Sequence, residues 1–252
     1  MSFRHLFAAL LCLAPMTHVR ADEVQNWTML LMHGPVKDNI VTWTEVQPRF
    51  RLDQGPSMSQ FLLRQGFGIR LKNDAEIILG YHWQENRSNP ANVRQENRIW
   101  QHVSVPLKLN DKGLQLTSQF RLEQRMFSNA PDTIWRSRAQ FRLDVPIKVL
   151  GGVGPMIASE TMFNLNSGNG NTRAGLEQQR TSIGISVPFG KAYVFDMSYI
   201  NQRLSRPGPN PVIHVFGIKL GYKIGKKSKS PTTLGLGDPL DRGPAMAMAP
   251  RP

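Results

Sequence analysis

Hydrophobic and polar residues alternate with a period of two along most of this chain, most clearly between residues 115 and 144. In the first half of this stretch, Phe120 and Leu122 share one parity, whereas Arg121 and Glu123 occupy the other. Successive side chains of a β-strand point to opposite faces of the sheet, so this pattern predicts a strand with one apolar and one charged face. A second alternating half follows a turn at 128–132, and we therefore predict a β-hairpin.

The two predicted strands are long for a soluble protein. They keep their alternation for about a dozen residues, whereas strands in globular proteins commonly have about 5 or 6. A tilted strand of about 9–11 residues crosses a bilayer, and a closed barrel pairs every backbone N–H and C=O without water. The pattern therefore predicts a transmembrane barrel with its apolar parity toward lipid and its charged parity toward the lumen.

The same alternation predicts further strands. The predicted strands are 27–33, 40–52, 60–71, 75–86, 94–108, 115–127, 134–148, 154–164, 176–189, 192–203 and 212–224. The ten strands from residue 40 onward suit the even number of single-chain bacterial barrels. As an eleventh strand, segment 27–33 would put the amino terminus on the wrong side of the membrane. We therefore expect either that this segment lies outside the barrel or lumen, or that 25–52 hides a further strand and the barrel has twelve. We expect an all-β, closed, up-and-down antiparallel transmembrane β-barrel of 10–12 strands over residues 22–225.

The two ends of the chain differ from this central region. Residues 1–21 read as a secretory signal peptide, with a short basic start, an apolar run and a small-residue cleavage site that ends at Ala21. The single cysteine, Cys12, lies in this segment, so the mature chain has no thiol for disulfides or metal sites. Residues 226–252 form a basic, Pro/Gly-rich segment that we predict to be a disordered tail.

The connections between the predicted strands alternate between short and long. Short turns are expected at 72–74, 110–113, 151–152 and 190–191, and longer polar loops at 86–93, 128–133, 166–175 and 205–211. Outer-membrane barrels place short turns on the periplasmic side and long loops outside. Aromatic residues prefer the two membrane interfaces. On this orientation, the expected interface aromatics are Trp83, Trp135 and Tyr199 at the outer level, and Tyr193 and Tyr222 at the inner level.

The chain is strongly basic, with a net charge of +13. Such a charge on an intracellular protein would suggest nucleic acid as a partner. Here the basic residues follow the strand alternation instead of forming a patch or arm, and the signal peptide indicates export. We therefore expect no nucleic acid partner and assign the surplus charge to the barrel lumen.

The predicted lumen-facing parity carries thirteen basic and six acidic residues. They are Glu45, Arg49, Arg51, Arg64, Arg70, Glu96, Arg98, Arg121, Glu123, Arg125, Arg136, Arg138, Arg142, Asp144, Glu160, Arg180, Asp196, Lys219 and Lys223. Two interpretations stand. Neighbouring strands can form arginine–carboxylate ladders that fill a narrow barrel. Alternatively, the surplus of arginine lines a basic pore that attracts anions.

Catalytic and metal chemistry have weak support in the sequence. His214, Ser137 and Ser159 share the apolar parity, which leaves open a Ser–His acyl hydrolase on the lipid-facing surface. No group of His, Asp and Glu has metal-ligand spacing, so we expect no metal and no cofactor.

Several short motifs follow one another along the chain. They include Trp43-Thr44-Glu45, Glu96-Asn97-Arg98-Ile99-Trp100-Gln101, Phe120-Arg121-Leu122-Glu123-Gln124-Arg125 and Glu160-Thr161-Met162-Phe163-Asn164. In this order they resemble a bacterial family called domain of unknown function 2490, whose members are predicted outer-membrane barrels. The resemblance covers most of 27–224 and implies a barrel in the outer membrane, with no catalytic residues to carry over. Gly217, Leu220 and Tyr222 also resemble the terminal signal read by the barrel-assembly machinery.

Together these observations lead us to expect a non-enzymatic, porin-like protein of the Gram-negative envelope. It would be a narrow passive channel for small anionic solutes or a structural envelope component. Its expected partners are outer-membrane lipid and, during biogenesis, the barrel-assembly machinery, and its oligomeric state is left open. A lipid-modifying outer-membrane enzyme is the first alternative. A soluble periplasmic barrel that binds an acidic ligand is the second.

Overall fold

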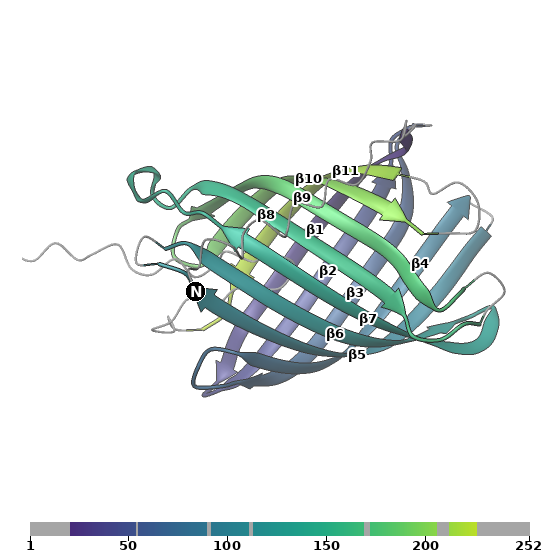
Figure 1. The fold of residues 1–252 in the computed structure, drawn as a ribbon, viewed down its shortest axis with the longest axis horizontal. Coiled ribbons are helices and arrows are strands. Elements are labelled where there is room, and N and C mark those ends of the chain that lie inside the picture. Colours follow the sequence, from purple (N-terminus) through teal and green to yellow (C-terminus); the bar gives the residue numbers. More distant parts are fainter. Residues whose placement is uncertain are drawn as a thin grey trace, which may run out of the picture.

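The computed structural model describes residues 21–53, 55–89, 92–110, 113–168, 172–205 and 212–225. These residues form eleven β-strands, which close into a barrel, and one short 3-10 helix (Figure 1). The predicted all-β closed barrel of ten to twelve strands is therefore confirmed. The predicted signal peptide, apart from its last residue, and the predicted tail at 226–252 lie outside the described residues.

The observed strands follow the predicted ones closely. They are β1 (Ala21–Lys37), β2 (Ile40–Arg51), β3 (Ser57–Arg70), β4 (Glu76–Asn89), β5 (Asn92–Lys108), β6 (Gln115–Phe127), β7 (Ala130–Asp144), β8 (Gly154–Asn164), β9 (Gly175–Phe189), β10 (Tyr193–Leu204) and β11 (Val212–Lys223), with the 3-10 helix η3 at Lys148–Leu150. Strand β7 was predicted at 134–148 and lies four residues earlier. It ends before Pro146, which has no N–H to donate to the next strand.

The barrel closes through a parallel pair. Each strand pairs with its neighbours in sequence in antiparallel fashion, whereas β1 pairs with β11 in parallel, with Trp27 opposite Gly217 and Leu31 opposite Gly221. Strands that reverse direction at every turn leave the first and eleventh running the same way. The predicted antiparallel pattern thus holds for ten of the eleven pairings. Segment 27–33 belongs to β1 in the barrel wall, so both predicted alternatives, a place outside the barrel and a twelve-stranded barrel, were wrong.

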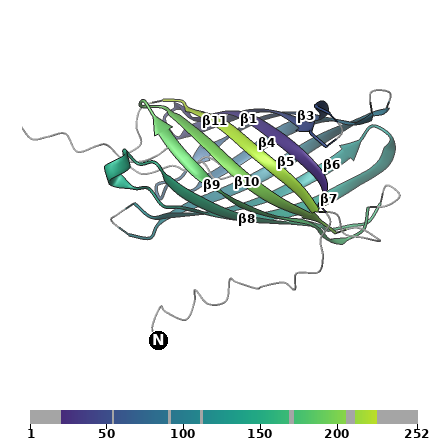
Figure 2. The same ribbon diagram turned by 90° about the horizontal axis from the view of Figure 1, so that it is seen from above.

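The odd strand number places the two ends of the described chain at opposite ends of the barrel. We call these the N-end, where β1 begins, and the C-end, where β11 finishes. The connection that carries η3 lies at the C-end, on the left of Figure 2. The predicted short turns lie at the C-end and the predicted long loops at the N-end. The lengths differ in places, because β4 and β5 extend into the predicted loop at 86–93, and residues 145–153 make a longer C-end connection.

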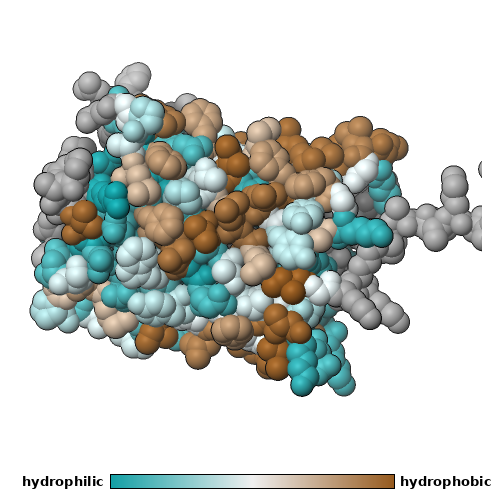
Figure 3. Space-filling model, turned by 180° about the vertical axis from the view of Figure 1, so that it is seen from behind, coloured by the Kyte–Doolittle hydropathy of each residue, from teal (hydrophilic) through white to brown (hydrophobic). Residues whose placement is uncertain are grey.

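The outer surface carries the apolar parity. Phe67, Leu79 and Ile183 are each more than half exposed, and similar residues surround the barrel toward the C-end. Toward the N-end, outward positions on several strands become polar, as Gln95 and Gln179 illustrate. Figure 3 shows the same trend on one face, with hydrophobic residues over the middle and the right, toward the C-end, and hydrophilic residues more frequent at the left.

The predicted interface aromatics lie on this outer surface at two levels. Tyr193 and Tyr222 are adjacent near the C-end, with ring centroids 5.1 Å apart. Trp135 and Tyr199 are exposed nearer to the N-end, and Trp83 packs edge-on against a neighbouring phenylalanine on β3. The two levels agree with the predicted girdles, while contact with lipid stays a prediction.

Inside the barrel, a row of two tryptophans and two glycines crosses four strands. Trp43 of β2 pairs with Gly66 of β3, which pairs with Gly80 of β4, which pairs with Trp100 of β5. The Trp100 indole lies against both glycines, because a Cβ added at Gly66 or Gly80 would come within 2.6 Å or 2.3 Å of its ring atoms. The glycines leave room for large aromatic side chains inside the lumen.

Candidate functional site

An aromatic cluster occupies one side of the lumen in the half toward the C-end. This cluster, which we call the plug, consists of Trp43, Trp100, His33 and His102. Ring centroids lie 5.4 Å apart for His33–Trp43, 5.6 Å for Trp43–His102 and 6.3 Å for Trp43–Trp100, all edge-on. All four side chains are buried, and apolar residues of β1, β2, β4 and β10 pack around the tryptophans.

The opposite wall of the same half carries a compact charged group, which we call the Arg142 group. It consists of Arg142, Asp144, Asp196 and Lys219. Arg142 donates to Asp144 at 2.6 Å and to Asp196 at 3.1 Å. Asp196 also contacts the Lys219 ammonium at 2.8 Å and accepts a hydrogen bond from Ser186 at 2.6 Å. Arg142 is only 1% exposed. The side chains of both walls have almost no exposure to water, and a cavity of only about 70 Å³ remains beside Arg142, Asp196 and Lys219, so the lumen is nearly filled at this level.

The half of the lumen toward the N-end contains a large cavity, which we call the cup. Its volume is about 1160 Å³, and it extends from the Trp27 level to rim residues such as Asp132 and Ser205. Ten arginines, four carboxylates and six glutamines contribute to its lining. The cup is therefore strongly basic and rich in amide groups that can both donate and accept hydrogen bonds.

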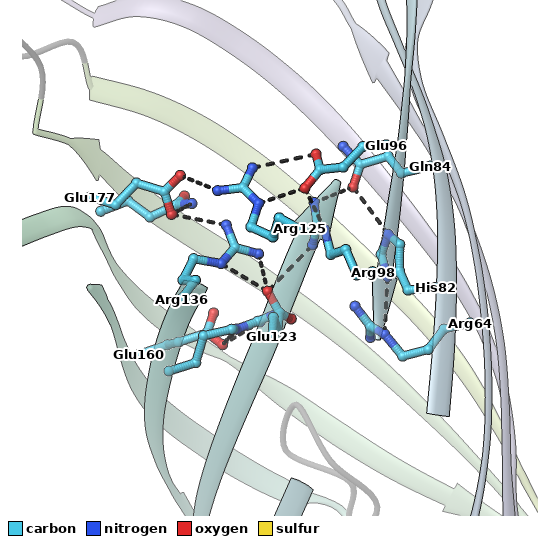
Figure 4. A network of polar contacts seen from close by, with 12 residues as sticks. Arg64, His82, Gln84, Glu96, Arg98, Glu123, Arg125, Arg136, Glu160 and Glu177 are labelled. Atoms are coloured by element: carbon cyan, nitrogen blue, oxygen red, sulfur yellow. Dashed lines mark hydrogen bonds and ion pairs between the residues drawn. The ribbon is translucent and has the colours of Figure 1, made fainter. Parts of the chain in front are cut away.

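Five of the ten arginines that line the cup belong to a continuous ladder of ion pairs, part of which Figure 4 shows: Arg98, Arg125, Arg136, Arg138 and Arg180. Arg125 bridges Glu96 and Glu177, with its contact to Glu177 at 2.7 Å. Arg136 continues the ladder from Glu177, at 2.9 Å, to Glu123.

The ladder extends from Glu123 deeper into the barrel. Arg138 contacts Glu123 at 2.9 Å and also pairs with Glu160, which contacts Arg180 at 3.1 Å. Separately, Arg64 pairs with Glu45 at 2.6 Å. Each of these charged groups has a partner of opposite sign, so the predicted arginine–carboxylate ladder is present.

The structure places the nineteen predicted lumen residues on the inward-facing parity, all of them buried or partly buried. Sequence reasoning missed Glu177, which alternation assigns to the outer face. The register between β8 and β9 shifts after Met162, which pairs with Gln178, while Phe163 pairs with Leu176. This bulge leaves Glu177 without a partner on β8 and turns its carboxylate into the lumen, between two arginines.

Arg49 differs from the ladder arginines. Within the described residues it has no carboxylate partner, and instead it donates to Gln47 and Gln60, each at 2.8 Å. Its guanidinium lies 3.7 Å from the centre of the Trp27 ring, and the Arg180 guanidinium lies 4.8 Å from the same ring. The buried Arg49 Nε makes no hydrogen bond. The wall of the cup thus holds a cation whose charge is not matched by a neighbouring carboxylate.

The residues of the hydrolase alternative are not brought together. Ser159 pairs with Thr181, Thr181 with Asn201, and Asn201 with His214, on four successive strands. Three strand spacings of about 4.8 Å separate Ser159 from His214 by about 14 Å, and Ser137 lies one strand further away. The histidine instead contacts the Tyr199 hydroxyl through its Nδ1.

Among the described residues, no group of three or more His, Cys, Asp or Glu side chains is arranged to hold a metal ion. The described segments also contain no helix with the length and apolar character of a membrane-spanning helix.

Comparison with known proteins places the chain in a family. Residues 24–212 match the family model described as Protein of unknown function (DUF2490). The chain is also 31% identical, over 205 residues, to an uncharacterised protein of Methylorubrum extorquens, with 79% of this chain and 88% of that protein covered. No solved structure matches the chain. With three quarters of its length matched by the family model, this protein belongs to the DUF2490 family.

Proposed function

We propose that this protein is an outer-membrane barrel whose cup binds a small anionic solute. The apolar outer surface toward the C-end, the two aromatic levels and the closed ladder of backbone hydrogen bonds support placement in a membrane. In this placement the C-end connections face the periplasm and the cup faces outward.

The observation that carries the proposal is the cup itself. Its lining has six more arginines than carboxylates, and its volume of about 1160 Å³ is large enough for a small organic molecule. Arg49 supplies an uncompensated cation in the wall, next to Trp27 and several glutamines. A carboxylate or phosphate group placed there would gain charge-assisted hydrogen bonds from Arg49, while the glutamines could bind its hydroxyl groups.

The filled half favours binding in the cup over steady passage through the barrel. The plug and the Arg142 group leave side chains with almost no exposure to water, so a solute that enters the cup meets a packed layer before the C-end. A narrow passive channel for small anions is the second candidate, and the surplus of arginine in the lumen favours it. Planar-bilayer recording separates the two, because the cup proposal expects no steady conductance and the channel expects an anion-selective one.

Binding can be tested by isothermal titration calorimetry of the refolded mature chain with citrate and pyrophosphate, using sucrose as a neutral probe. We expect saturable binding of at least one anion and none of sucrose. Removing one charge-assisted contact costs about 1.5–3 kcal/mol, so Arg49→Gln should weaken binding by about tenfold or more. Arg203→Gln is the matched control, since Arg203 is exposed on the outer face of β10. Equal affinity in both variants, or no heat with either anion, would contradict the proposal.

Membrane placement can be tested separately by spin labelling. The predicted mature chain has no cysteine, so a single introduced cysteine is the only site that the label modifies. A spin label at Phe120→Cys should be accessible to oxygen and shielded from a water-soluble nickel chelate. A label at Gln179→Cys, on the polar N-end exterior, should show the reverse. If both labels are equally wetted and the protein fractionates without detergent, the soluble periplasmic barrel replaces our proposal.

A further inference from the structure

A second uncompensated arginine, Arg121, lies deeper in the barrel, at the boundary between the cup and the plug. It is 7% exposed, and its guanidinium lies 4.9 Å from the centre of the Trp100 ring and 5.7 Å from that of Trp43. Among the described residues, no carboxylate forms an ion pair with it, and its Nε and Nη1 groups make no hydrogen bond. A buried charge without a counter-charge is costly, so this site calls for an anion.

The side chains next to Arg121 also carry hydrogen-bond donors that have no acceptor. The indole nitrogen of Trp100 and both ring nitrogens of His102 are buried without hydrogen-bond partners. Guanidinium and indole N–H groups can only donate, and an imidazole carries at least one further N–H. Around Arg121 the plug therefore presents several buried donors that have found no acceptor in the protein.

The nearby carboxylates are already engaged with other arginines. Glu160 is shared between Arg138 and Arg180, with the Arg180 contact at 3.1 Å. Glu45 is bound by Arg64 at 2.6 Å. The positive charge of Arg121 therefore has no carboxylate of its own. A carboxylate of the ladder could pair with Arg121 only if it gave up one of its present arginine partners.

A small cavity lies beside Arg121. Its volume is about 10 Å³, and Arg121, His102, Gln119, Gln140, Arg138 and Glu160 line it. A space of this size holds one particle about as large as a water molecule. Sulfate, phosphate and carboxylates are larger than this space and would need the lining side chains to move. This cavity is separate from the cup, which is about a hundred times larger.

We infer that this cavity is a binding site for a single monatomic anion of the halide class, with chloride as the abundant member. The ion accepts hydrogen bonds from Arg121 and from the donors beside it, and it balances the surplus charge. It also connects the base of the arginine ladder to the plug. The inference does not depend on the cup binding a solute, since the two sites differ in place and in the size of anion they admit.

Crystals of the refolded mature chain grown or soaked in bromide test the site directly. An anomalous bromide peak beside the Arg121 guanidinium is the expected result. Ordered water there, with bromide absent at that position, would overturn the inference. Bromide bound only near Arg49 would also overturn it, while leaving the cup proposal in place.

Solution stability gives a second readout. Thermal unfolding is followed at constant ionic strength while sodium gluconate is replaced by chloride, bromide or sulfate. A ligand that binds only the folded state raises the unfolding midpoint, and we expect a saturable rise of about 2–4 °C with chloride and bromide but not with sulfate. Arg121→Met should abolish the response, whereas Arg49→Gln should keep it. Equal responses to sulfate and chloride, or an unchanged halide response in Arg121→Met, would contradict the inference. If Arg121→Met does not fold, the bromide crystal experiment on the unaltered protein decides.

Discussion

The two halves of the lumen are built on the same strands, yet they solve the problem of an interior full of polar groups in different ways. Toward the N-end, arginines and carboxylates bridge one another around a cavity, as Arg125 and Arg136 do through Glu177. Toward the C-end, indole and imidazole rings pack face to edge on one wall, a compact group of ion pairs around Arg142 covers the other, and little free space remains between them. Ion pairs around a cavity hold the open half, whereas the filled half combines tight ring packing with one compact charged group.

This difference teaches that the charge surplus and the degree of filling are separate properties of a small barrel. The cup is basic because some of its arginines, such as Arg49, exceed the available carboxylates. The filled half is closed because Gly66 and Gly80 admit the Trp100 ring. A change in one half should therefore leave the other half largely intact, and the variants below separate the two contributions.

The largest expected effect comes from removing a shared carboxylate of the ladder. Glu123→Gln removes the carboxylate that Arg136 and Arg138 share. Arg136 then keeps only Glu177, which it shares with Arg125, and Arg138 keeps only Glu160, which it shares with Arg180, so the buried ladder has one negative charge too few. Breaking a buried pair in this way costs about 3–5 kcal/mol. Urea unfolding in lipid vesicles measures it. The control is Glu85→Gln, which removes the outer-surface pair with Arg87 and should cost less than about 1 kcal/mol. Equal losses in the two variants would show that the ladder does not stabilise the cup wall.

A smaller loss is expected from overfilling the other half. In Gly66→Ala the new methyl group overlaps the Trp100 ring and the Ile78 side chain, because the Cβ position lies 2.6 Å from Trp100 Cη2. Overpacking of this kind costs about 1–3 kcal/mol. Placing the same substitution in a Trp100→Phe background should reduce its cost, and a double-mutant cycle measures the coupling. An additive cycle would mean that Trp100 does not occupy the space over Gly66.

The third variant tests whether the plug is what closes the lumen. Replacing Trp43 and Trp100 together by alanine removes both indoles and should connect the cup to the C-end. We expect a small anion-selective conductance in planar bilayers, where the cup proposal expects no steady conductance from the unaltered barrel. Circular dichroism and resistance of the folded form to mild denaturant confirm that the variant recorded is a barrel. Continued silence from a folded variant would place the barrier at the Arg142 group on the opposite wall.

The smallest effect is expected on the outer surface. His214→Ala and Ser159→Ala should not change hydrolysis of phospholipid vesicles, because about 14 Å separates the two residues. Phospholipid turnover that falls in both variants would revive the enzyme alternative and would require a different arrangement of β8 to β11.

Alternation predicted most of the wall because the two faces of a strand meet different surroundings. Phe120 and Arg121 are adjacent in sequence, and one is half exposed on the outer surface while the other is buried inside. Alternation was least clear in β1, and the structure gives the physical reason. Its inward residues, such as Leu31, pack against the plug, and its outward residues, such as Leu30, belong to the apolar outer surface. A strand that is apolar on both faces does not alternate, so its full length was underestimated.

The candidate site was predictable in its charges but not in its shape. Period-two reasoning placed Arg49 and Arg121 inside, but it could not show which arginines lack carboxylates, since partners depend on the register of every strand. The plug was missed because no single strand shows the large side chain together with the space that admits it. Trp43, Gly66, Gly80 and Trp100 lie on four strands, and only their register forms a row. The inward orientation of Glu177 could not be predicted, because it depends on a bulge in β9 that the sequence of this strand does not indicate.

The parallel seam between β1 and β11 has a consequence for topology in the envelope. In a barrel with an even strand count, both termini emerge in the same compartment, whereas here β1 starts on one side and β11 stops on the other. In the outer-membrane placement that we propose, a chain inserted from the periplasm must therefore translocate the residues before β1 and keep the residues after β11 in the periplasm. Protease added to intact cells should therefore remove an epitope fused before β1, whereas an epitope fused after β11 should be protected from cleavage.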